Sequence, residues 1–177
     1  MSGAGDKTGF QFDADNSNRF AEIGNGGLVI VSDTSIRLLS ADGSELWSAN
    51  IQMSAPALTS GGGRVVAYDV GGTELFVLDG NGVLLEQTTE DPIVAANLNG
   101  SGMLALTTEA SGTKGHVEVY SAALQKLFDF NAHRRFVADA CVTEDGKYLA
   151  AVTMGQADSV FVSNVVIYDL TQRDTGH

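Results

Sequence analysis

A repeat with a period of about 40 residues is the feature of this sequence that most limits its fold. Residues 39–47, 78–85 and, more loosely, 120–128 align with one another. The first residues of these segments lie 39 and 42 positions apart. Each segment starts on a large apolar or aromatic residue, crosses a short turn and ends in an apolar run. Each therefore predicts two strands joined by a tight turn.

A second register within the chain has the same period. Residues 57–58, 96–98 and 140–142 each come just before a turn that leads into an apolar strand. The first residues of these segments lie 39 and 44 positions apart. The agreement of two independent registers argues against a chance similarity.

The hydrophobic pattern between these landmarks indicates an all-β chain. Short runs rich in Val, Leu, Ile, Thr and Tyr alternate with glycine-containing turns, and helical periodicity is almost absent. The expected strands are residues 28–32, 36–40, 45–50, 64–70, 74–78, 83–88, 93–98, 103–108, 117–121, 126–130, 137–142, 148–153 and 164–168.

Four strands in a period of about 40 to 45 residues are typical of a β-propeller blade. A single blade exposes two apolar faces, so its neighbours must cover them. The sequence predicts an all-β chain, a β-propeller of about four four-stranded antiparallel blades in a small ring or a partial propeller. The blades are expected at residues 20–51, 52–89, 90–132 and 133–170, with the last blade ending after its third strand. Residues 1–19 are expected to form a linker with a possible closing strand, and residues 171–177 a tail.

Composition excludes several classes of partner. The 177 residues include 22 Asp and Glu but 10 Lys and Arg, which leaves a net charge of −12. Nucleic acid and anionic lipid surfaces both require a basic protein surface, so neither is expected to bind. Apolar runs such as 28–31 and 149–152 are far shorter than the roughly 20 residues of a membrane helix. We expect no membrane span in this chain, although an upstream anchor can be missing from it.

Residues 42–47, Asp-Gly-Ser-Glu-Leu-Trp, resemble the turn of the quinoprotein-type (PQQ-like) propeller repeat. In that repeat, Asp or Asn and Gly make the turn, and an aromatic residue on the outer strand packs between blades. Residues 20–170 also resemble uncharacterised membrane-anchored propeller proteins of Gram-positive gut bacteria, whose blades are WD40-like or PQQ-like. The third repeat lacks Asp-Gly, and Trp47 has no counterpart in the other repeats. The resemblance implies further blades and an extracytoplasmic location at the cell envelope; a cytoplasmic location is the alternative. We expect Trp47 to be buried against the second blade.

Each apparent motif for catalysis or cofactor binding in this sequence lacks a residue or a structural context that it requires. Cys141 has no neighbouring Cys, so the vicinal disulfide of quinone-binding propellers is impossible, and we expect a small hydrophobic residue on an inner strand. Residues 13–18 imitate the start of a calcium loop, but Asn18 and Gly24 occupy the positions that need Gly and Glu. Residues 111–114 spell S-x-x-K without the helix that this motif requires. We therefore predict no enzyme, no cofactor, no metal site and no catalytic residue.

The loops that join blades and the loops between second and third strands are expected to gather on one face of a propeller, where function is usually found. They define the candidate interaction surface: Glu90, Asp91, Lys114, His133, Arg134, Arg135 and Asp158. One hypothesis is a non-catalytic scaffold or protein-interaction module with an unidentified protein partner. The alternative is a sugar-binding or cation-binding protein or hydrolytic enzyme that uses Glu90, Asp91 and Asp158 at the channel mouth. The absence of a convergent set of His, Cys and carboxylate residues favours the first.

The basic cluster 133–135 has a simpler interpretation as a solvated loop with ion pairs to Asp129 or Asp139. Closure of the propeller also has two alternatives. Phe10 and Phe12, in a segment of alternating polarity, can complete the fourth blade of a four-bladed ring. Otherwise two copies form an assembly of about eight blades, a homodimer that covers the open faces. We favour the homodimer.

Overall fold

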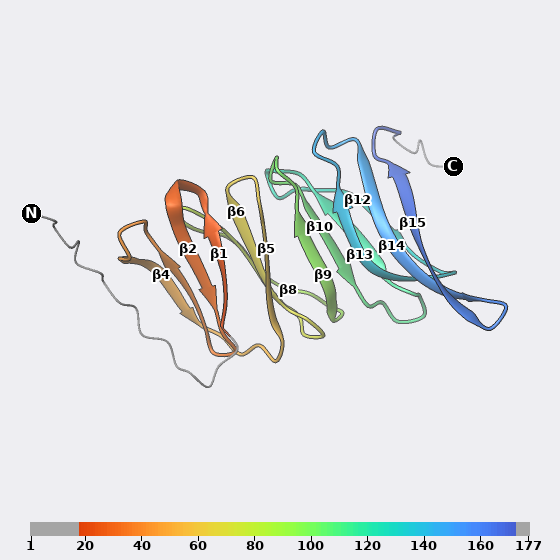
Figure 1. Ribbon diagram of the computed structural model, residues 1–177, viewed down its shortest axis with the longest axis horizontal. Helices are drawn as coiled ribbons and strands as arrows, with labels where there is room; N and C mark the ends of the chain where they lie inside the picture. The colour runs from red at the N-terminus through yellow and green to blue at the C-terminus, as the bar shows by residue number, and fades with distance from the viewer. Residues whose placement is uncertain (1–17, 173–177) are drawn as a thin grey trace, which may run out of the picture.

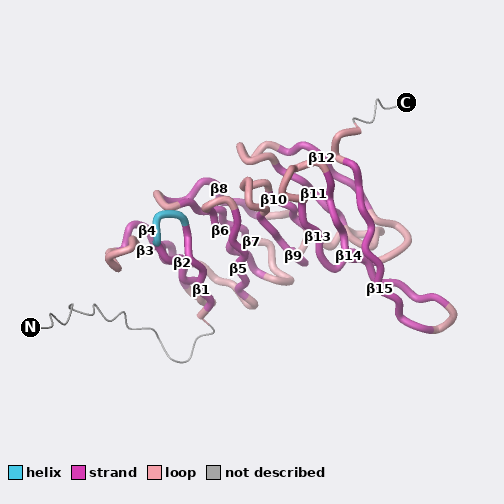
Figure 2. The backbone as a smooth tube through the Cα atoms, turned by 45° about the horizontal axis from the view of Figure 1, so that its top comes forward, coloured by secondary structure: helices cyan, strands magenta, loops and turns pink. Residues whose placement is uncertain are grey.

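The fold is all-β, and its strands form four separate antiparallel sheets that follow one another in chain order (Figure 1). The computed structural model describes residues 18–172. The sheets lie in a row, with the first and the fourth at opposite ends in both views (Figures 1 and 2). The described sheets therefore form a partial propeller and not a closed four-bladed ring. Phe10 and Phe12, proposed as a closing strand, lie outside the described residues.

Each sheet is a meander in which strands pair in the order of the chain. The first sheet contains β1 (Arg19–Ile23), β2 (Gly27–Val31), β3 (Ser35–Leu39) and β4 (Glu45–Asn50), with a 3-10 turn at Gly24–Gly26. The second contains β5 (Pro56–Gly61), β6 (Arg64–Asp69), β7 (Glu74–Asp79) and β8 (Gly82–Thr88). The third contains β9 (Ile93–Leu98), β10 (Leu104–Thr108), β11 (His116–Tyr120) and β12 (Lys126–Asn131). The fourth has three strands, β13 (Phe136–Val142), β14 (Tyr148–Ala157) and β15 (Val160–Asp169).

The core consists of three apolar clusters, each between two consecutive sheets. Alternate residues of each strand point to opposite faces, so the two inner sheets contribute to the clusters on both sides. Trp47, Leu85 and Phe128 occupy equivalent positions on the outer strands of the first three sheets, and each packs against the cluster that its sheet shares with the next. Trp47 is half-buried, which corrects the expectation of full burial, but it does pack against residues of the second sheet.

The repeat seen in the sequence is also a repeat of strand register. Trp47 pairs with Leu38, Leu85 with Val77 and Phe128 with Val119. In all three sheets a register shift lies directly beside this pair, on the side of the turn between the third and fourth strands. A bulge bends its strand locally. Its recurrence shows that the aligned segments share one backbone geometry.

The first strands of consecutive sheets, β1, β5, β9 and β13, contact one another along the row. The turn that follows the first strand of the second sheet lies close to the corresponding turn of the third sheet, and glycine in both turns allows this approach. Gly62 has φ +59°, and a Cβ there would overlap the backbone of Gly102 in the next sheet. A side chain at this position would therefore separate the second and third sheets.

The loops expected on one face do lie together. Each loop that joins two sheets hydrogen bonds with the loop between the second and third strands of the preceding sheet. The bonds join Met53 N to Asp33 O (2.8 Å), Thr89 N to Thr73 O (2.8 Å) and Lys114 N to Ala132 O (2.7 Å). This face therefore positions most of the residues considered for function.

Three local expectations are wrong. β1 and β5 were not among the expected strands, although both complete their sheets. Residues 154–162, between the expected strands 148–153 and 164–168, were expected to form a loop, but they are the end of β14, a turn at Asp158 and Ser159, and the start of β15. Together these form a projecting hairpin (Figure 2). Cys141 lies on β13 but is exposed, because its side chain is on the face of the sheet opposite the core.

None of the helices among residues 18–172 has the length and apolar character needed to cross a membrane.

Candidate functional site

A polar recess of about 460 Å³ lies between the second and third sheets. It is bounded by the end of β8, the loop that leads to β9, and β11 with the start of β12. Its lining residues are Gln87, Thr88, Thr89, Glu90, Asp91, Thr108, His116, Glu118 and Lys126. Two predicted surface residues, Glu90 and Asp91, thus lie beside a group of titratable side chains that the sequence analysis did not select.

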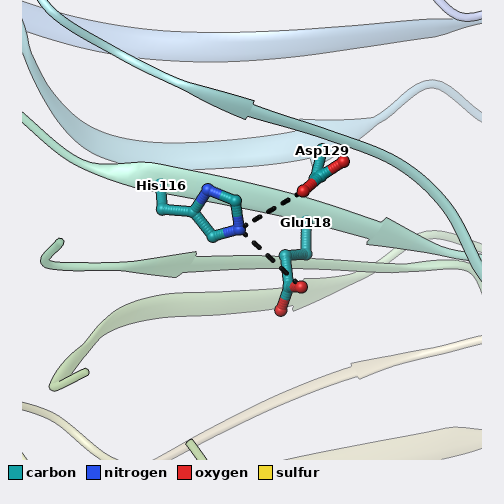
Figure 3. Close-up of side chains that lie close together, drawn as sticks. All are labelled: His116, Glu118 and Asp129. Carbon is teal, nitrogen blue, oxygen red and sulfur yellow. Dashed lines mark ion pairs between the residues drawn. The ribbon is translucent and has the colours of Figure 1, made fainter. Parts of the chain in front are cut away.

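His116, Glu118 and Asp129 form the centre of that group (Figure 3). His116 and Glu118 alternate on β11 and so point to the same face of the sheet. Asp129 joins them because β12 pairs with β11 in a register that places it opposite Glu118. The His116 Nε2 atom lies 3.7 Å from Glu118 Oε1 and 3.8 Å from Asp129 Oδ2. An imidazole and two carboxylates therefore converge on one point.

Neighbouring side chains hold two of the three residues in place. His116 Nδ1 lies 2.9 Å from Asn131 Oδ1, which can only accept a hydrogen bond, so Nδ1 is the donor. The Tyr120 hydroxyl donates to Glu118 Oε2 at 2.9 Å. Both contacts turn the remaining atoms, His116 Nε2 and Glu118 Oε1, towards the centre of the group. Burial, and then the Glu118 carboxylate, raise the pKa of Tyr120, so its hydroxyl stays protonated as a donor.

Lys126 supplies the positive charge that faces these carboxylates. Its Nζ lies 3.1 Å from Glu118 Oε1 and 3.7 Å from Asp129 Oδ2. The hydrogen bond to Glu118, together with the two carboxylate charges, raises the pKa of Lys126. About half of the Lys126 side chain is exposed, so the ammonium can also move into water.

This group was not predicted because its three residues form no local motif in the sequence. His116 and Glu118 are two residues apart on an expected strand, and this spacing was the available signal. Asp129 could be added only after the pairing register of β11 and β12 was known.

The other predicted surface residues are divided among different places. Asp91 and Lys114 line a recess of about 640 Å³ between the third and fourth sheets. There Lys114 Nζ lies 4.2 Å from the centroid of the Phe136 ring, within the range of a cation–π contact. Asp158 lies instead at the exposed tip of the β14–β15 hairpin.

The basic cluster lines a smaller recess of about 340 Å³. Within it Arg135 Nη2 donates to Val162 O at 2.6 Å, whereas His133 and Arg134 are exposed. The ion pairs expected with Asp129 or Asp139 are not among those of residues 18–172. Asp129 faces His116 and Lys126, and Asp139 accepts a hydrogen bond from Asn97. Arg135 therefore has a structural role in attaching the hairpin.

An apolar surface covers the face of the fourth sheet that points away from the third sheet. We call it the outer face. Register pairs such as Val152 with Val165 and Ala150 with Ile167 place its side chains side by side on β14 and β15. Its large apolar members, each between 39% and 65% exposed, are Tyr148, Val152, Val165 and Ile167. The opposite face of the same sheet is packed against the third sheet.

The model of a family of unknown function, DUF5711, matches residues 7–176. The chain belongs to this family. No curated protein matches the DUF5711 chain in sequence.

Solved structures similar to the DUF5711 chain are propeller proteins. Hsv2p of Kluyveromyces lactis has a TM-score of 0.60 and 16% identity over 93% of this chain and 51% of that one. The Pan2 WD40 domain of Neurospora crassa has a TM-score of 0.52 and 18% identity over 86% and 48%. BamB of Moraxella catarrhalis has a TM-score of 0.52 and 13% identity over 85% and 42%. The chain spans about half or less of these proteins. The similarity confirms the WD40-like and PQQ-like propeller fold.

Proposed function

We propose that this DUF5711 chain is a non-catalytic protein-interaction module whose binding surface is the outer face of the fourth sheet. The observation that carries the proposal is the difference in burial between the two faces of this sheet. Leu149 and Ala151 on one face are fully buried, while Val165 and Ile167 on the other are 65% and 58% exposed. Contiguous apolar patches of this kind mark interaction sites on soluble proteins.

The partner that fits this surface is another propeller sheet, and we propose that a second copy of the chain supplies it. Within the chain, the second and third sheets have a neighbouring sheet on both faces, whereas the first and fourth sheets have one on a single face. Two copies related by a two-fold axis along the channel would place the fourth sheet of each against the first sheet of the other. Such an arrangement closes into a ring of about eight blades.

The proposed location is the outside of the cell, at the envelope, as in the membrane-anchored propeller proteins of Gram-positive gut bacteria that the sequence resembles. In that setting the module would act as a scaffold for other proteins. Protease added to intact cells of the native host should degrade the chain. Full protection in intact cells, with degradation after lysis, would contradict the location.

The oligomeric state tests the proposed surface. Sedimentation equilibrium of the purified chain should show a reversible monomer–dimer equilibrium. Val165→Asp, which places a charge in the centre of the outer face, should shift this equilibrium to monomer, because burying an unpaired carboxylate is costly. The matched control is Leu127→Asp, since Leu127 is similarly exposed, at 60%, on the outer strand of the third sheet.

Two results would contradict the proposal. One is a wild-type chain that stays monomeric at all accessible concentrations. The other is a Val165→Asp variant that folds, as judged by circular dichroism, and dimerises as strongly as the Leu127→Asp control.

A further inference from the structure

We propose that His116, Glu118 and Asp129 bind a divalent transition metal ion of the Zn²⁺ class. The ligands are His116 Nε2, one oxygen of Glu118 and one oxygen of Asp129. This site is separate from the outer face of the fourth sheet and does not depend on the proposed interaction function.

The distances between the candidate ligand atoms are close to those of a metal site. Zn²⁺ binds nitrogen and oxygen at about 2.0–2.2 Å, so two ligands of a tetrahedral ion lie roughly 3.4 Å apart. His116 Nε2 is 3.7 Å from Glu118 Oε1 and 3.8 Å from Asp129 Oδ2. All three ligand atoms lie within 4.8 Å of one another, so modest side-chain rotations would bring them to bonding distance.

The contacts around the site orient the ligands as metal-binding residues are usually oriented. A metal-bound His almost always donates its other ring N–H to an oxygen acceptor, and ligating carboxylates are themselves hydrogen bonded. Asn131 accepts from His116 Nδ1, and Tyr120 donates to Glu118 Oε2. In the neutral ring with its proton on Nδ1, the form that binds a metal, the lone pair of Nε2 faces two carboxylate oxygens. A bound cation removes the resulting electrostatic repulsion.

The ligand set favours one class of metal. Mg²⁺ and Ca²⁺ take oxygen ligands, in octahedral or larger shells, whereas imidazole suits Zn²⁺ and its neighbours in the transition series. His116 therefore selects against the alkaline-earth ions. Three protein ligands leave one position of a tetrahedral ion for water, on the side of the polar recess that Glu90 and Asp91 line.

Lys126 competes with the metal for the same carboxylates. Its ammonium contacts both Glu118 and Asp129, so metal binding must move it away. The exposed, flexible side chain allows this movement at little cost. Removing the ammonium should strengthen metal binding, whereas an ion-pair network without a metal function would only lose a contact.

Isothermal titration of ZnCl₂ into the chelator-treated chain of 177 residues tests the site. We expect about one ion per chain, and a loss of at least about tenfold in affinity for His116→Asn and for Asp129→Asn, since each removes one ligand. Asn131→Ala should weaken binding by about 10- to 100-fold through loss of ligand orientation. Lys126→Met should tighten binding. Co²⁺ should bind with the strong visible absorption of a four-coordinate ion.

Other side chains with affinity for Zn²⁺ provide matched controls. His133→Asn and Cys141→Ser remove an exposed imidazole and an exposed thiol elsewhere in the chain and should leave the affinity unchanged. The variants are compared by circular dichroism to confirm that they fold. Using the Val165→Asp background separates this result from any change in dimerisation.

Three results would overturn the proposal. They are unchanged Zn²⁺ affinity in folded His116→Asn and Asp129→Asn variants, loss of binding in either control, and a preference for Ca²⁺ over Zn²⁺.

Discussion

At the scale of single residues, Asp145 shows how short turns in this acidic chain are stabilised by their own carboxylates. Asp145 Oδ1 accepts hydrogen bonds from Thr143 Oγ1 at 2.7 Å and from Lys147 N at 3.1 Å. These bonds, that from Thr143 first, lower the pKa of Asp145 below its ordinary 3.8. Asp42 has a lowered pKa for the same reason, through Ser40 and Ser44, in the turn between β3 and β4. The lowered pKa means that the ionised form stabilises the folded state.

The pH dependence of stability tests this role. The stabilisation by ionised Asp145 is complete above the unfolded pKa and is lost as the pH falls through the lower folded pKa. Asp145→Asn should therefore lower the melting temperature near neutral pH, and the difference from wild type should shrink as the pH falls below about 4 and disappear only below the lowered folded pKa. Asp158→Asn removes the same charge from an exposed turn and controls for net charge. Equal effects of the two variants at every pH would contradict the role of the hydrogen bonds.

At the scale of strands, the outer strands β4, β8 and β12 contribute one large side chain each to the cluster between their sheet and the next. Trp47 is the largest of the three and packs against a cluster that includes Val65 and Phe76 of the second sheet. The register shift just before each of these residues bends the outer strand at the same place in all three sheets. Similar packing is therefore obtained with Trp, Leu or Phe at the same position.

Trp47→Ala should destabilise the contact between the first and second sheets. Full burial would cost about 3–5 kcal/mol, but Trp47 is half-buried, so we expect about 2–3 kcal/mol in urea unfolding followed by circular dichroism. Leu46→Ala, on the adjacent and exposed position of β4, should change stability by less than about 0.5 kcal/mol. Similar losses for the two variants would mean that the outer strand does not pack through Trp47.

At the scale of the whole molecule, a net charge of −12 opposes the association that the outer face favours. Salt screens repulsion between the copies over a length that falls from about 30 Å at 0.01 M to about 3 Å at 1 M. Apolar contacts are not weakened by this screening. Dimerisation should therefore strengthen as NaCl rises through this range, as measured by sedimentation. A dimer that weakens as salt is added would indicate an interface held by ion pairs, contrary to the apolar outer face.

The sequence alone predicts the propeller fold because its two signals, strand alternation and a repeat of about 40 residues, are both local. It also predicts that the last blade has three strands. It does not predict β1 and β5, whose residues have weak strand patterns and gain their hydrogen bonds from β2 and β6. The projecting hairpin escapes prediction for a related reason. Asp158 and Ser159 adopt positive φ, at 49° and 67°, without the Asn-Gly signal typical of such turns.

The sequence by itself determined which residues are apolar, where the chain turns and how often the unit repeats, and these properties set the fold. The tertiary structure alone decided which polar residues meet. Asp129 reaches His116 and Glu118 only through the pairing of β11 with β12, and Glu90 and Asp91 reach the same recess only through the packing of two sheets. The outer face, likewise, can be identified only once the structure shows that the third sheet packs on the opposite face of the fourth sheet. Contacts between distant residues depend on register and packing, and neither is written in a local pattern.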